Sequence, residues 1–206
     1  MTSLFRRSIA TLVLICAGAG ALVACASDEA DRGPSPAETA TAQRALGTLV
    51  TLASERMTTA DTVAAAKWGT SRPIDDPARE KAVIDGATAQ GVKLGIPSDT
   101  VRRIIQDQIE ANKTVQRALY ATWRADPAKR PTHRPDLDTQ VRPKLDRIDG
   151  ALLTAIRQAE PLLVSPGCGE ALDRAKAATT DELGLDAAHR EGLGQALAHV
   201  CPAPAS

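Results

Sequence analysis

Apolar residues recur at intervals of three and four along most of the chain, which is the spacing of one face of an amphipathic α-helix. The clearest stripe includes Leu46, Leu49, Ala53, Ala60 and Val63. Clusters of Gly, Pro, Asp and Ser separate this stripe from the ones that follow, with Ser98 as a helix cap. The pattern predicts helices over residues 37–68, 77–94, 99–124, 141–163, 168–183 and 186–200.

The chain begins with a different pattern. Residues 9–24 form an apolar run that follows Arg6 and Arg7 and is too short to span a bilayer comfortably, which is typical of an export signal. We therefore expect a signal peptide over residues 1–24, a flexible tether over residues 25–36 and one folded domain over residues 37–206.

The residues around Cys25 allow two forms of export. Leu22-Val23-Ala24-Cys25 resembles the bacterial lipoprotein box, in which Cys25 becomes the lipidated first residue of the mature chain. Ala24-Cys25-Ala26 also fits ordinary signal peptidase, which would leave no anchor. We favour a lipid-anchored protein of the periplasm or cell surface, with a freely secreted protein as the alternative, and any membrane contact would be through the anchor.

Composition supports a helical fold and excludes one class of partner. Only 2% of the residues are aromatic, and strands favour aromatic and β-branched side chains. The 25 basic and 25 acidic residues cancel; without Arg6 and Arg7 the mature chain has 23 and 25, a net charge of −2. Nucleic-acid binding needs a basic surface or aromatic stacking platforms. We therefore expect an all-α protein that does not bind nucleic acid.

Cys168 and Cys201 are the two cysteines of the predicted folded domain. In an oxidising compartment such a pair is typically a disulfide. The bond would join the start of the fifth predicted helix to the end of the sixth and so clamp a C-terminal helical hairpin. Metal binding is the alternative, although the three histidines show no ligand spacing around these cysteines. We expect no metal site.

Two cations lie on the face of the first helix that should be buried. Arg56 is seven residues from both Leu49 and Val63, so at about 100° per residue it points along the centre of the stripe. Lys67 follows Arg56 by eleven residues, almost three whole turns, and shares that face. Lys67 is near enough to the helix end for its ammonium to reach water, whereas Arg56 is not.

Two amides interrupt the apolar stripe of the third helix. By the same arithmetic Asn112 lies within about 20° of Ile105 and Leu119, and Gln116 is one turn further on. An unpaired buried amide costs about 1–3 kcal/mol, so each must be paired in the core or contact a ligand. The pattern leaves both roles open.

Further polar candidates stand where helices begin. Asp76 is a plausible cap, with Pro77 next, so Arg79 and Glu80 fall in the first turn of the second helix. Alone, Arg79 would be a surface salt-bridge residue. Arg142 lies at the start of the fourth helix. Inward-facing cations and amides, without an evident nucleophile, general base or phosphate loop, suit a site that holds a compact dianion and stabilises developing negative charge.

Three blocks of sequence carry a recognisable pattern in consistent order and spacing. They are RMTTADTVAAAKW from residue 56, PIDDPARE from residue 73 and DQIEANKTVQ from residue 107. They resemble the exported chorismate mutases, the gamma subclass of the all-helical AroQ type. The resemblance implies a single-domain bundle of about six helices, chorismate mutase II-like, that rearranges chorismate to prephenate without a cofactor. It also implies a homodimer with the site inside each chain.

The resemblance assigns roles by matching position. Arg56, Arg79 and Arg142 would bind the two substrate carboxylates, with Asn112 assisting. Pro143 disfavours a helical conformation at Arg142, so nearby Arg134 and Arg147 are fallback candidates for its role.

The remaining matched positions concern the ether oxygen and the ring hydroxyl of chorismate. Lys67 and Gln116 would donate hydrogen bonds to the ether oxygen, where negative charge grows as its bond to carbon breaks. Glu80, with the backbone of Asp76, would meet the ring hydroxyl.

Two other functions stay open at this point. A lipid-anchored helical binding protein could keep the small-dianion pocket without catalysis. A purely structural bundle is the other, in which Arg56 and Lys67 only pair with acidic neighbours such as Asp75 or Asp76. Chorismate turnover separates all three.

Overall fold

The computed structural model describes residues 33–202 of the 206-residue chain. The predicted signal peptide, Cys25 and most of the predicted tether lie outside the described residues. Within residues 33–202, no helix is both long and apolar enough to cross a membrane.

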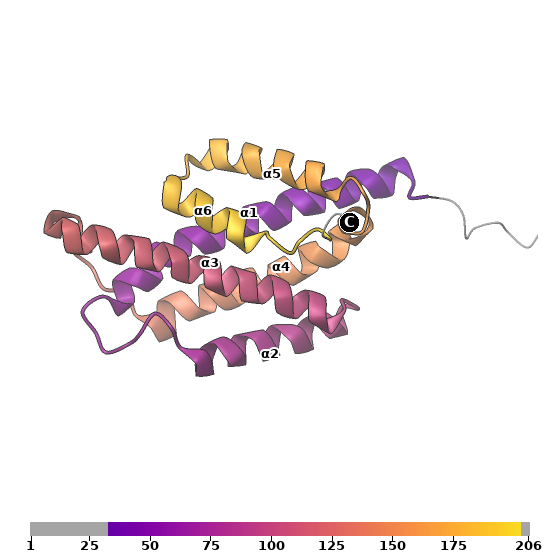
Figure 1. Ribbon diagram of the computed structural model, residues 1–206. Coiled ribbons are helices and arrows are strands. Elements are labelled where there is room, and N and C mark those ends of the chain that lie inside the picture. The colour runs from indigo at the N-terminus through magenta and orange to yellow at the C-terminus, as the bar shows by residue number, and fades with distance from the viewer. Residues whose placement is uncertain (1–32, 203–206) are drawn as a thin grey trace, which may run out of the picture. The chain divides into compact units, whose positions relative to one another are not determined.

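The described residues form a bundle of six α-helices and contain no β-strand, which confirms the predicted all-α fold (Figure 1). A 3₁₀ turn, η1 (Pro127–Lys129), and a π-helical turn, η2 (Leu137–Val141), lie between the third and fourth helices. The six are α1 (Pro36–Lys67), α2 (Pro77–Lys93), α3 (Ser98–Ala125), α4 (Arg142–Leu163), α5 (Cys168–Leu183) and α6 (Ala187–Ala196).

Local capping explains several helix ends. Ser35 and Glu38 form a reciprocal capping box that begins α1, and Asp76 caps α2 as predicted by accepting from the Arg79 N–H. The prediction of Ser98 as a cap was wrong. Pro97 occupies the cap position with an extended ψ of 135°, so Ser98 is already the first helical residue. The last helix ends at Ala196, earlier than predicted, because residues 197–200 form turns.

The core is built around α1. Helices α3, α4, α5 and α6 all pack against α1, while α2 packs on α3 and α4. Figure 1 shows α2 and α5 on opposite sides of this arrangement. The stripe residues Leu46, Leu49 and Ala53 are almost fully buried, and burial of each leucine stabilises the fold by about 1.5–3 kcal/mol.

Helices α5 and α6 follow one another as predicted for a C-terminal hairpin, but α5 packs mainly on α1 and α6 on α3 rather than on each other. Gly184 ends α5 with a φ of +58°, a left-handed conformation that glycine adopts without a Cβ penalty. Cys168 begins α5, and Cys201 lies just beyond α6. The two are joined by a disulfide with a Cα to Cα distance of 5.7 Å, which confirms the predicted pairing.

Candidate active site

A cavity of about 250 Å³ lies among α1, α2, α3 and the start of α4. The segment between α1 and α2 and the turn η2 complete its wall. The structure brings all eight site residues predicted from sequence into the lining of this one cavity. They are Arg56 and Lys67 from α1, Asp76, Arg79 and Glu80 from the start of α2, Asn112 and Gln116 from α3, and Arg142 from α4.

Arg56 is buried, as its place in the stripe predicts, with 4% of its surface exposed. Its Nε donates to Asp149 Oδ1 at 2.8 Å, and its Nη1 donates to the Gln108 carbonyl at 3.2 Å. Removing one member of a buried ion pair typically costs about 3–5 kcal/mol. A guanidinium has five N–H groups, so Asp149 fixes Arg56 while donors remain for a ligand.

Asn112 and Gln116 of α3 both line the cavity and are hydrogen-bonded through their amide nitrogens, while Gln116 Oε1 is buried without a partner. Asn112 Nδ2 donates to the Arg56 carbonyl at 2.9 Å, and Gln116 Nε2 donates to Asn112 Oδ1 at 2.8 Å. This chain of bonds fixes which end of each amide is the donor. The bond to Asn112 uses one of the two N–H groups of Gln116 and leaves the other for a ligand.

Lys67 brings a partly desolvated ammonium to the cavity. Its Nζ donates to the Ile74 carbonyl at 3.2 Å. Burial lowers the pKa of Lys67 below its ordinary 10.5, and the nearby charges of Asp76 and Glu80 only partly oppose this. Among the described residues no carboxylate forms a salt bridge with Lys67. Neither Lys67 nor Arg56 pairs with Asp75 or Asp76, the acidic neighbours named for a purely structural bundle; the partner of Arg56 is Asp149.

The start of α2 presents three of the candidates together. Asp76 Oδ1 accepts from the Arg79 N–H at 3.1 Å, and Glu80 Oε1 accepts from the Asp76 N–H at 3.0 Å. The Arg79 guanidinium lies 3.6 Å from Asp146 of α4. The simple salt bridge expected of Arg79 is thus present, and the same side chain also lines the cavity.

Arg142 is helical, with φ −59° and ψ −45°, although the following Pro143 disfavours that conformation. The π-helical turn η2 leads directly into α4, and the Arg142 N–H donates to the Leu137 carbonyl within it. Pro143 then falls in the first turn of α4, where its missing N–H is not needed. The Arg142 side chain reaches the cavity and pairs with Asp138.

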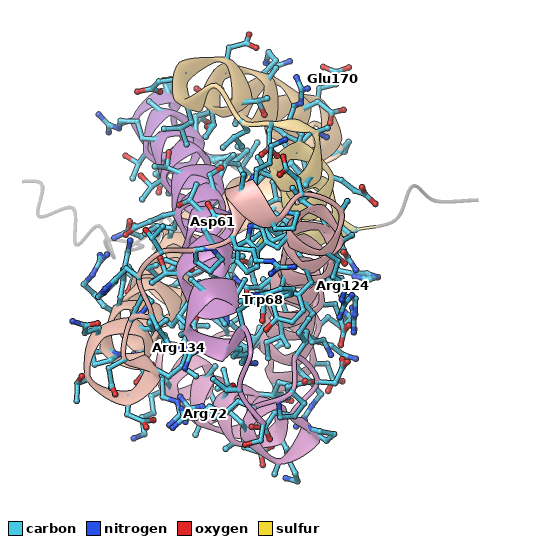
Figure 2. The ribbon with its side chains drawn as sticks, turned by 90° about the vertical axis from the view of Figure 1, so that its left-hand side faces the viewer. Asp61, Trp68, Arg72, Arg124, Arg134 and Glu170 are labelled. Carbon is cyan, nitrogen blue, oxygen red and sulfur yellow. A yellow bond between two sulfur atoms is a disulfide. The ribbon has the colours of Figure 1, made fainter. Side chains whose placement is uncertain are left out.

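The two fallback arginines are engaged elsewhere. Arg134 donates to the Trp68 carbonyl at 2.9 Å, and both residues are labelled near the end of α1 in Figure 2. Arg147 pairs with Glu55 at 2.6 Å. Neither lines the cavity.

Four charged residues that line the cavity were not among the candidates from the sequence: Arg72, Lys113, Asp146 and Asp149. Asp149 could have been found, because it is four residues after Leu145 and three before Leu152 on the apolar face of α4. Arg72 pairs with Asp138 at 3.3 Å. It lies in a segment without apolar periodicity, so no pattern in the sequence predicted that its side chain would face the cavity.

Charges of both signs line the cavity, and the cations are in excess. There are six cations and four carboxylates, which leaves a formal charge of +2 for a bound dianion to balance. Within the described part of the chain, no three His, Cys, Asp or Glu side chains gather as a metal site would require. The cations are Arg56, Lys67, Arg72, Arg79, Lys113 and Arg142, and the carboxylates are Asp76, Glu80, Asp146 and Asp149.

The fold and the cavity define an all-helical protein with a cation-rich pocket whose formal charge of +2 suits a small dianion. The family model described as chorismate mutase type II matches residues 47–117. The chain is also 36% identical over 153 residues to a secreted chorismate mutase of Mycolicibacterium smegmatis, covering 74% of this chain and 84% of that relative. This chain belongs to the chorismate mutase type II family.

Other relatives and solved structures agree. A secreted chorismate mutase of Mycobacterium tuberculosis is 32% identical over 158 residues, 77% of this chain and 79% of that protein. The crystal structure of a chorismate mutase from Burkholderia thailandensis is 40% identical with a TM-score of 0.70, covering 76% of this chain and 99% of that one. One from Burkholderia phymatum has a TM-score of 0.74 at 33% identity, with coverages of 79% and 99%.

Proposed function

We propose that this protein is an exported chorismate mutase, which rearranges chorismate to prephenate. The carrying observation is the cavity of formal charge +2 in which arginines, a lysine and an oriented amide from four segments of one chain converge. In this reaction the ether C–O bond breaks as a C–C bond forms within the same molecule, so no nucleophile is needed. The site must hold the reactive conformer and stabilise charge.

The arginines are proposed to bind the substrate's two carboxylates. Arg56 is held by Asp149, and Asn112 is held by the Arg56 carbonyl, so this part of the site is organised before substrate arrives. Arg79 and Arg142 are paired with Asp146 and Asp138 and are more exposed. When substrate binds, Arg79 and Arg142 would leave these protein carboxylates and pair with a carboxylate of the substrate.

Lys67 and Gln116 are proposed to stabilise the ether oxygen as it gains negative charge. The free N–H of Gln116 and the ammonium of Lys67 supply donors in a partly desolvated site, where such bonds are stronger than in water. Glu80 is proposed to accept from the ring hydroxyl. The backbone N–H of Asp76, also matched to that hydroxyl, is bonded to Glu80 in the free protein.

Loss of chorismate absorbance, with prephenate identified as the product, tests the proposal. Lys67→Ala should lower kcat by roughly a hundredfold or more, as for removal of an oxyanion donor. Lys93→Ala is the matched control, because Lys93 is exposed at the end of α2 and does not line the cavity. A loss for Lys67→Ala below roughly tenfold would count against its role.

A binding protein without catalysis is the competing function. It would bind chorismate, measured by calorimetry, and leave it unchanged after long incubation. Tight binding without turnover by the wild type would overturn the mutase proposal.

Export and assembly are proposed at a finer level than the family itself. The secreted relatives support export, and we propose a lipid on Cys25. Incorporation of labelled fatty acid by the wild type, and none by Cys25→Ala, would support the anchor.

We also propose a homodimer, measured by sedimentation equilibrium. All eight candidate residues line the cavity from one chain, so activity per chain should not change on dilution.

A further inference from the structure

Lys113 is a buried cation of α3 that has no part in the mechanism above. Only 7% of its surface is exposed, and its ammonium faces three carboxylates. The Nζ atom lies 3.0 Å from Glu80 Oε2, 3.3 Å from Asp75 Oδ1 and 2.6 Å from Glu110 Oε1. Glu110 is on the same helix, whereas Asp75 and Glu80 flank the start of α2. Lys113 therefore ties α3 to the part of the cavity wall that carries Glu80.

The number of partners decides how Lys113 can act. An ammonium has three N–H donors, and Lys113 has three carboxylate partners. Burial lowers the pKa of Lys113, but the carboxylates of Glu110, Glu80 and Asp75 outweigh it and raise the pKa above 10.5. Lys113 is thus a cation surrounded by protein carboxylates, and its contact with Glu80 Oε2 is the one that also has hydrogen-bond geometry. An effect of Lys113 on a ligand can therefore pass through Glu80.

Glu80 is the partner that lines the cavity and is held at both oxygens. Oε1 accepts from the Asp76 N–H at 3.0 Å, and Oε2 accepts from Lys113 Nζ at 3.0 Å. A carboxylate offers about four lone-pair sites, so acceptor capacity remains after these two bonds. An ionised carboxylate can only accept hydrogen bonds. When its orientation is fixed, a hydrogen-bond donor of the substrate must lie at one particular place in the cavity.

We propose that Lys113 is a positioning residue that fixes Glu80 as the acceptor for the ring hydroxyl and so makes the site selective for hydroxylated substrates. The inference rests on the proposed function and deepens it. A Glu80 side chain without Lys113 keeps the Asp76 bond but can rotate about it. The hydroxyl would then lose a preorganised acceptor, while the carboxylates and the ether oxygen keep their partners.

Two substrates separate this role from a merely structural one. The probes are chorismate and its analogue in which the ring hydroxyl is replaced by hydrogen. Lys113→Met should lower kcat/KM for chorismate by roughly tenfold or more, as for loss of a charge-assisted hydrogen bond. The analogue, which has no hydroxyl to place, should react within about twofold of its wild-type rate. The selectivity between the two should therefore fall.

The matched control is Lys81→Met. Lys81 is an exposed cation of α2 that pairs with Asp85 and does not line the cavity, so it changes the net charge equally. Equal losses for both substrates in Lys113→Met would show a structural role only and overturn the proposal. A loss no larger than that of Lys81→Met would also overturn it.

If Lys113→Met folds poorly only because it leaves three carboxylates without their shared cation, a double-mutant cycle still tests the proposal. Glu80→Gln with Lys113→Met removes one of those charges. If Lys113 acts through Glu80, the double variant should have the selectivity of Glu80→Gln alone. Additive losses of selectivity would overturn the proposal. A wild type that turns over neither substrate would instead refute the proposed function, so the two failures are distinguishable.

Discussion

Gln116 places an amide where a carboxylic acid could also serve as a donor. An amide donates at any ordinary pH, whereas a carboxyl group donates only while protonated. We therefore expect kcat to be flat across roughly pH 6 to 8. In Gln116→Glu the rate should fall as pH rises, because the introduced acid loses its proton. Initial rates of chorismate loss across this range, for both proteins, measure the difference.

Lys67 sets the alkaline limit of the same profile. Burial lowers its pKa from 10.5, and the group is charged only below its pKa. The wild-type rate should therefore fall on the alkaline side, beginning before an ordinary lysine would titrate. A wild-type rate that already falls steeply through neutrality, or a Gln116→Glu profile as flat as the wild type's, would contradict the assignment of Gln116 as donor.

Angular position along a helix predicted which side chains face inward but not what they meet. Arg56 and Asn112 follow from the spacing of the stripes alone. The partner of Arg56 is 93 residues away on α4, and that pairing depends on how α1 and α4 pack. The role of Lys113 also needs α2 and α3 together, because two of its three carboxylates come from the other side of that contact.

At the scale of elements, α6 depends on the absence of a side chain at Gly192. A Cβ there would lie 2.8 Å from Val115 Cγ2 and 3.2 Å from Met57 Sδ. Gly192→Ala should therefore destabilise the protein by about 1–3 kcal/mol through overpacking. The control is Gly194→Ala on the same helix, where a Cβ meets nothing within 4 Å. It should stabilise the helix by about 0.5–1 kcal/mol. Urea denaturation of both compares them, and equal effects would refute the packing argument.

His189 ties the first turn of α6 to α1. Its Nδ1 lies 2.8 Å from Asp186 and its Nε2 lies 3.4 Å from Asp61. These carboxylates, Asp61 above all, raise the pKa of His189 from 6.5 to about 9 against the effect of burial. The folded state thus favours the protonated form of His189. The stabilisation is complete below pH 6.5 and is lost as pH rises through about 9.

Thermal unfolding at several pH values measures this contribution. Both carboxylates are more than half exposed, so about 1–2 kcal/mol is expected rather than the full value of the shift. His189→Asn should lower the melting temperature by a few degrees near pH 6, and this difference should shrink toward pH 10. His199→Asn, an exposed histidine beside Asp107, is the control. A constant difference at all pH values would refute the ion-pair origin.

Helix existence was easier to predict than helix ends or their joints. Long stripes in α1, α3 and α4 fix which segments are helical, because burial of one face dominates. The π-helical turn before α4 and the cap at Pro97 depend on single backbone conformations, which the pattern of apolar residues does not encode. Arg142 owes its helical conformation to that turn, and for this reason the effect of Pro143 was overestimated.

Across the whole molecule, near-neutral charge conceals a locally cationic interior. The charges of the whole chain cancel, while the cavity retains a formal charge of +2. The exclusion of a polyanionic partner and the inference of a small dianion are therefore compatible. Global composition was sufficient to exclude a polyanionic partner. Inferring a small dianion required the positions of individual cations on the helix faces.

The disulfide tests whether fold stability and the site are separable. It closes a loop with a sequence separation of 33 between Cys168 and Cys201, and a bond of this kind stabilises a protein by about 2–4 kcal/mol. No residue of α5 or α6 lines the cavity. Cys168→Ser with Cys201→Ser should therefore lower the free energy of unfolding, measured in urea, and leave kcat unchanged below the unfolding transition. Unfolding of the wild type with and without a reductant is the control for the substitutions themselves. A fall in kcat while the double variant is still folded would show that the hairpin also positions the catalytic helices, through the packing of α6 on α3.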